Sequence, residues 1–412
     1  MRVAAPTGNM SDGLLQLGRR PPPTRGAALW QSGFRPFFAL APLAATVALG
    51  GWLALLHGAI NATGSLTGVD LHVHEMVFGF VAAVIAGFLL TAVKNWTGRA
   101  PASPRVLVVL VALFVVGRVA LIAEALGGPR GIGGVEPLFL VLLAILIARV
   151  VIVARNWRNL GIATLVALLA LADVLSHVAA WTGSSSLAAS MRAAAVLLPC
   201  VLLAVIGGRV IPMFTRNVVL EHGGVVRQPG ALDIAAVVAV AAAALAGTAA
   251  PLHRALAPLE PWVVIVAGAL TLARMIGWQS LRARSTPLLW ILHVGHGALG
   301  FGLLALGAAR RWPTTIPGSA ATHLLAVGAI AVLCLGMMTR VALGHTGRPL
   351  VLPRSALVAY LVLLVALALR VAAAWRPVLL DPSAAAFALA FLLFLVGYAG
   401  PLLRPRADGA PG

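Results

Sequence analysis

Twelve apolar segments, each of about 20 residues with few or no charges, recur along this chain of 412 residues. A helix that crosses the ~30 Å hydrocarbon core of a bilayer needs about that length, so each segment is predicted to be a transmembrane helix. Composition agrees, because 61% of the residues are hydrophobic and only 10% are charged. The predicted spans are residues 37–57, 72–94, 105–125, 135–154, 159–182, 188–211, 231–250, 261–279, 287–309, 320–344, 354–374 and 384–403. The predicted fold is therefore an all-α, polytopic membrane protein with about 12 transmembrane helices.

These spans make one transmembrane domain over residues 37–403. Residues 1–36 lack the apolar core of a cleavable signal peptide and contain a proline run with several arginines, so we expect a disordered cytoplasmic tail. Residues 404–412 are expected to form a second cytoplasmic tail.

The placement of the basic residues predicts the orientation of the helices. The net charge is +19, and most of the 30 lysines and arginines fall at the two termini and in the five loops on the same side. This regular asymmetry follows the positive-inside rule, so both termini are predicted to be cytoplasmic. It also argues against nucleic-acid binding, and the expected partner is the lipid bilayer. The only cysteines, Cys200 and Cys334, lie in apolar segments without a CxxC partner, which excludes a thiolate metal box.

Histidines gather at the outer ends of the predicted helices. The stretch Leu71–Met76, which reads LHVHEM, opens the second helix with His72, His74 and Glu75. His177 lies near the outer end of the fifth helix, and His323 lies at that of the tenth. Ionisable groups in a membrane are costly and indicate a function or a partner. Residues i and i+2 of a helix point about 200° apart, so His72 and His74 are expected to serve two different sites.

Helices 2 and 10 share a pattern. In each, a histidine lies at the outer end, His74 or His323, and a Thr-Gly-Arg sequence at the inner end begins 23 positions later. Both helices are predicted to run from outside to inside, and two facing helices can supply both axial ligands of one haem. His74 and His323 are therefore the predicted haem ligands. His72, with His177 or Glu75, is a candidate for copper or a distal-pocket position, and Asp173 is expected to orient His177.

Arginines at the inner ends are usually topogenic. Arg209 and Arg340 lie close enough to the apolar segments to need partners, so either an anion site or a tie between helices is expected there.

Several long motifs closely resemble the NnrS family across about residues 30 to 400. They read GFRPFF at 33–38, HVHEMVFG at 72–79, AGFLLTA at 86–92, NWTG at 95–98, RVIPMFT at 209–215, MTR at 338–340 and GHTGR at 344–348. The resemblance implies a bacterial inner-membrane protein of nitric oxide metabolism and nitrosative stress that contains haem, expected to be b-type, and copper. The family motifs carry over to six positions here: His72, His74, Glu75, His323, Arg340 and His345. His296 departs from the pattern, because it stands where a tyrosine is common.

The layout also resembles, more distantly, the catalytic subunit of haem-copper oxidases, where outer histidines of helices 2 and 10 hold a haem. The predicted helix at 231–250 contains no histidine, so the dinuclear site of those enzymes is not expected. The likeness is one of fold alone.

Three classes of function follow from these observations. The first is a haem protein that acts on nitric oxide or protects against it, with an unspecified electron donor. The second is a metal-free secondary transporter, which twelve helices with internal Gly and Pro also fit, although no six-helix repeat occurs. The third is a sensor or haem-delivery protein without turnover.

Overall fold

A computed structural model describes residues 28–220 and 224–409. Over these ranges the chain is helical and contains no strand. Twelve helical segments there are long and apolar enough to cross a membrane, which confirms the predicted fold class and number of spans. The spanning helices are α2 (Phe34–Leu56), α3–η2–α4 (Gly68–Thr97), α5 (Pro104–Ala125), η3–α6 (Ile132–Val153), η4–α7 (Trp157–Thr182), α8 (Ser185–Leu220), α9 (Gly230–Ala249), α10–η6 (Glu260–Trp278), α11 (Pro287–Arg311), α12–η8–α13 (Gly318–Gly344), α14 (Arg354–Ala372) and η9–α15 (Pro377–Leu403).

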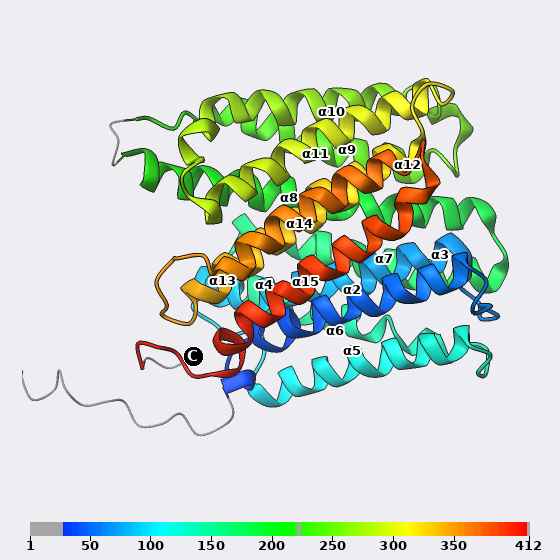
Figure 1. Cartoon of the computed structure of the whole chain (residues 1–412), viewed down its shortest axis with the longest axis horizontal. Helices are drawn as coiled ribbons and strands as arrows, with labels where there is room; N and C mark the ends of the chain where they lie inside the picture. Colours follow the sequence, from blue (N-terminus) through cyan, green and yellow to red (C-terminus); the bar gives the residue numbers. More distant parts are fainter. Residues whose placement is uncertain (1–27, 221–223, 410–412) are drawn as a thin grey trace, which may run out of the picture.

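The helices form one elongated bundle, with α5 along one edge and α9, α10 and α11 along the opposite edge (Figure 1). The segments α3 and α12 lie at one end of the bundle, and α4, α13 and the C-terminus lie at the other. The two predicted histidine-bearing ends are therefore on the same side of the molecule, opposite the C-terminus.

The first spanning helix begins a few residues before the predicted start at residue 37. Residues 1–27, 221–223 with His222, and 410–412 lie outside the described residues, but Ala28–Trp30 form η1 and α2 begins at Phe34. Arg35 is fully buried and donates from Nη1 to the carbonyl oxygens of Leu402 at 3.1 Å and Arg404 at 2.6 Å. These bonds tie the first spanning helix to the end of the last.

The second and tenth spans share an irregularity that their sequences do not reveal. α3 (Gly68–His74) passes into the π-helical η2 (Glu75–Val81) and then into α4 (Ala82–Thr97). α12 (Gly318–His323) passes into the π-helical η8 (Leu324–Ala331) and then into α13 (Val332–Gly344). His74 and His323 are thus each the last residue before a π-helical segment. Such segments are rare and frequently lie at functional sites, so the similarity of these two spans extends to their backbones.

Candidate functional site

His72 and His74 project from α3 into different surroundings, as their spacing predicts. His74 is 2% exposed and faces side chains from the fourth span and from α7. His72 stacks on Trp52 of α2, with ring centroids 4.6 Å apart and ring planes 25° apart. The two histidines therefore belong to two separate sites.

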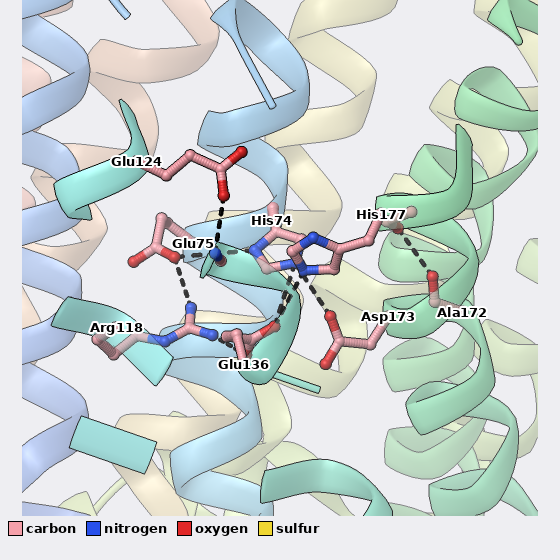
Figure 2. Close-up of polar contacts among 10 residues, drawn as sticks. His74, Glu75, Arg118, Glu124, Glu136, Ala172, Asp173 and His177 are labelled. Atoms are coloured by element: carbon pink, nitrogen blue, oxygen red, sulfur yellow. Dashed lines mark hydrogen bonds and ion pairs between the residues drawn. The ribbon is translucent and has the colours of Figure 1, made fainter. Parts of the chain in front are cut away.

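The first site is a buried group of two imidazoles and two carboxylates (Figure 2). His74 Nε2 lies 3.0 Å from Asp173 Oδ1 and 3.3 Å from Glu136 Oε2. His177 Nε2 lies 3.6 Å from the same Glu136 oxygen. One ligand atom from each of these four residues lies within 4.8 Å of all the others, so the group is able to hold a metal ion.

Local structure explains why these four side chains converge. Asp173 and His177 are one turn apart on α7 and share a face. Glu136 stands between the short helix η3 (Ile132–Val135) and α6 (Leu138–Val153). It approaches α5 closely because Gly117 has no side chain, and a Cβ there would lie 2.9 Å from Glu136 Cα.

Arg118 of α5 forms ion pairs with two carboxylates of this region, Glu75 and Glu136. Its guanidinium bonds Glu75 Oε1 at 2.5 Å and forms a second, close ion pair with Glu136. Figure 2 shows Arg118 between these two carboxylates. Glu75 Oε1 also lies 3.7 Å from His74 Nδ1, on the side of the ring away from Asp173. This contact is too long for a hydrogen bond, so Glu75 acts on the His74 ring through its charge.

A cavity of about 220 Å³ leads to His74. Phe78 and Met191 line its buried part, and the exposed residues Thr67 and Ser185 line its outer part. Among the four residues of the group, His74 is the one that lines this cavity, so the cavity reaches the group at that imidazole.

The second site is a cavity of about 340 Å³ that both His72 and His323 line. His323 Nδ1 lies 2.7 Å from the carbonyl oxygen of Ser319, so Nδ1 carries the proton and Nε2 keeps a free lone pair. His72 Nδ1 is buried and has no hydrogen-bond partner among the described residues. Most of the other lining side chains are apolar, and Arg370 is the cation among them.

The structure distributes the predicted site residues differently from the sequence-based pairing. It brings His74 together with His177, and His72 together with His323, whereas His74 and His323 line different cavities. The reason is the rotation of α3, which turns His72, rather than His74, toward α12. Asp173 was expected to orient His177, but its hydrogen bond goes to His74.

Arg340 and His345 lie at the other end of the bundle, away from both sites. Arg340 Cζ lies 3.6 Å from the centre of the Phe214 ring, a cation–π contact that ties α13 to α8. Arg209 Nη1 donates to Asn159 Oδ1 at 2.9 Å and ties α8 to η4. His345, just beyond the tenth span, packs on Phe34. Burial, with the charges of Arg406 and Lys94, lowers the pKa of His345.

A family model described as NnrS protein matches residues 28–406 of this chain. The chain belongs to the NnrS family. A search of curated proteins found no match to it. Membership fits a membrane protein related to nitric oxide, and the buried His/Glu/Asp group of this NnrS family member gives it a place for a metal.

Sequence reasoning from histidines missed Glu136 and Arg118 of this NnrS family member. Both residues are charged and lie within or beside apolar spans, where an ionisable residue indicates function by default. Attention to every such residue, rather than to imidazoles alone, marks Arg118, Glu124, Glu136 and Asp173 near the histidine-bearing ends of the predicted spans. That signal was available without the structure.

Proposed function

We propose that this protein is a haem-containing protein of the bacterial inner membrane that acts in nitric oxide metabolism or in protection against nitrosative stress. The observation that carries the proposal is the cavity shared by His72 and His323, in a chain that belongs to the NnrS family. Two imidazoles from facing helices are the donor set that a bis-histidine haem needs.

The residues of the cavity fit a haem. Nε2 of His323 has a free lone pair because Nδ1 donates to a backbone carbonyl. His72 has a buried ring nitrogen without a partner, and stacking on Trp52 fixes the plane of its ring. Phe80 and Phe387 supply apolar walls, and Arg370 supplies a cation that suits a propionate.

In this arrangement His72 and His323 would hold the iron of a haem, and the apolar walls would keep water from it. A haem bound there would supply one-electron chemistry. With two imidazoles as its protein ligands such a site would suit electron transfer, and chemistry on nitric oxide would then belong to a second centre. The group around His74, reached by its own cavity, is the candidate for that centre.

The absorption spectrum of the purified protein tests the haem. We expect a Soret band in the wild type, which His72→Ala and His323→Ala each abolish or shift. His74→Ala should leave it unchanged, and so should the matched control His57→Ala, since His57 is an exposed outer histidine paired with Asp381. The absence of a Soret band after haem supply would refute the proposal. Loss of the band in His74→Ala but not in His72→Ala would restore the pairing predicted from the sequence.

A further inference from the structure

We infer that His74, Glu136, Asp173 and His177 bind a divalent metal ion of the iron, manganese or zinc class rather than copper(I). This centre is separate from the His72–His323 cavity, and the inference does not depend on a haem being bound there. The inference rests on the proposed function in one respect: it names the metal of the His74 group, which the proposed function leaves unnamed.

The geometry is that of an assembled ligand set. The four ligand atoms all lie within 4.8 Å of one another, and none of the four residues is more than 3% exposed. His177 Nε2 and Asp173 Oδ2 are buried without a hydrogen-bond partner in the part of the chain that is described. Buried polar atoms are normally satisfied. His177 Nε2 and Glu136 Oε2 lie 3.6 Å apart within the group and neither has a hydrogen-bond partner among the described residues, so they indicate a missing partner that accepts lone pairs.

The charge of the surroundings matches a divalent cation. Glu75, Glu136 and Asp173 bring three carboxylates, and Arg118 brings the one guanidinium that pairs with them. With neutral imidazoles, two negative charges remain uncompensated in a buried place, which is costly unless a cation neutralises them. The nearby Glu124 carboxylate accepts hydrogen bonds from Ser65 and Gly133, and these neutral donors stabilise its charge without offsetting the negative charge of the region.

The donor chemistry selects the class of metal. Copper(I) favours thiolate and thioether ligands, whereas mixed imidazole and carboxylate ligands suit iron(II), manganese(II) and zinc(II). The four donors include no sulfur, and Cys200 and Cys334 are not members of the group. Met191, which lines the cavity that reaches His74, is the one sulfur-containing residue of that lining.

The cavity also makes the centre open to an outside ligand. It reaches His74 from a surface region where Asp70 of α3 and Arg192 of α8 form an ion pair. Nε2 of His74 is hydrogen-bonded to Asp173 Oδ1, so a metal bound at this nitrogen would replace that bond and release its proton.

Metal content and metal affinity test the inference directly. The purified full-length protein is stripped with a chelator, dialysed anaerobically against iron(II), manganese(II), zinc(II) or copper(I) alone, and analysed by elemental mass spectrometry. We expect about one equivalent of a divalent metal per chain and weaker retention of copper(I). Glu136→Gln and Asp173→Asn should each lower the affinity of the protein for the divalent metal ion by about 10-fold to 100-fold.

Two controls separate the centre from its neighbours. Glu124→Gln makes the same chemical change on a carboxylate outside the group, and Met191→Leu removes the only sulfur of the cavity lining, so both should bind like the wild type. Retention of the Soret band in Glu136→Gln would show that folding and the haem site are intact. Failure of the haem proposal would appear as a missing Soret band, and failure of this inference would appear in the metal analysis.

Three results would overturn the inference. They are tighter retention of copper(I) than of every divalent ion, loss of metal in Met191→Leu, and unchanged divalent binding in both Glu136→Gln and Asp173→Asn. The first is measured on the wild-type protein, so it stands even if a variant does not fold.

Discussion

His72 and His74 are two residues apart in α3, yet they line two different cavities. The separation follows from the helix, which turns by about 100° per residue and points the two rings about 200° apart. His72 joins His323, and His74 joins Glu136, Asp173 and His177. Only one residue of backbone, Val73, separates the two sites, so the motif HVH connects two candidate metal centres by a short covalent path.

The orientation of the chain can be tested by labelling introduced cysteines. Ser186, in the first turn of α8, and Ala100, in a loop, are exposed at the predicted outer and inner faces, respectively, and the native Cys200 and Cys334 are buried. We expect Ser186→Cys, but not Ala100→Cys, to react with a membrane-impermeant maleimide in spheroplasts, because the basic loops are predicted to stay inside. Lysis should expose Ala100→Cys. The opposite pattern would refute cytoplasmic termini.

Arg118 should be essential for stability. Replacing it with Met leaves the carboxylates of Glu75 and Glu136 buried without their cation, and breaking a buried ion pair by removing one partner costs about 3–5 kcal/mol. The thermal midpoint of the purified protein in detergent should fall clearly for Arg118→Met and change little for Arg254→Met, which alters an exposed loop arginine. Equal midpoints for the two variants would contradict this role for Arg118.

Gly268 sets the distance between α10 and α11. A Cβ at this position would lie 2.7 Å from the carbonyl oxygen of Gly300 and 2.7 Å from the amide nitrogen of Leu304. Since both neighbours are backbone atoms, Gly268→Ala should force the helices apart and cost about 1–3 kcal/mol. Gly161→Ala is the control, because open space surrounds that glycine. The free energies of unfolding of the two variants are compared in denaturant. If Gly268→Ala is as stable as Gly161→Ala, α10 and α11 do not pack closely at Gly268.

His345, just beyond the tenth span, should make stability depend on pH. Its pKa is lowered in the folded protein, first by burial and then by the charges of Arg406 and Lys94. The unfolded chain then binds a proton more readily, so this residue favours unfolding as the pH falls below about 6.5. His345→Asn should therefore lose less of its stability than the wild type on acidification. Thermal midpoints measured above and below that pH give the comparison, and identical pH dependence in both proteins would exclude the effect.

The sequence predicted much of the arrangement along the membrane normal. Apolar segment length predicted twelve spans, and the structure contains twelve in its described part. It also places α3 and α12 at the same end of the bundle (Figure 1), as their matching histidines indicate. The angular separation of His72 and His74 was predictable too, because it depends only on helix geometry.

The sequence could not decide which partner each ring meets. The pairing of His74 with His323 rested on equal spacing along two helices, and spacing gives depth without giving direction. The direction depends on how α3 is rotated in the bundle and on the π-helical segments η2 and η8. Neither segment was predicted from the sequence.

Apolar length and the arrangement of charges, together with the long family motifs, were enough to indicate a polytopic protein and its family, because the bilayer imposes the same constraint on every span. Only the tertiary structure brought Glu136, from a loop before α6, and Asp173, from α7, to His74. Contacts between residues 62 and 99 positions apart depend on how separate helices pack, and no local pattern contains that information.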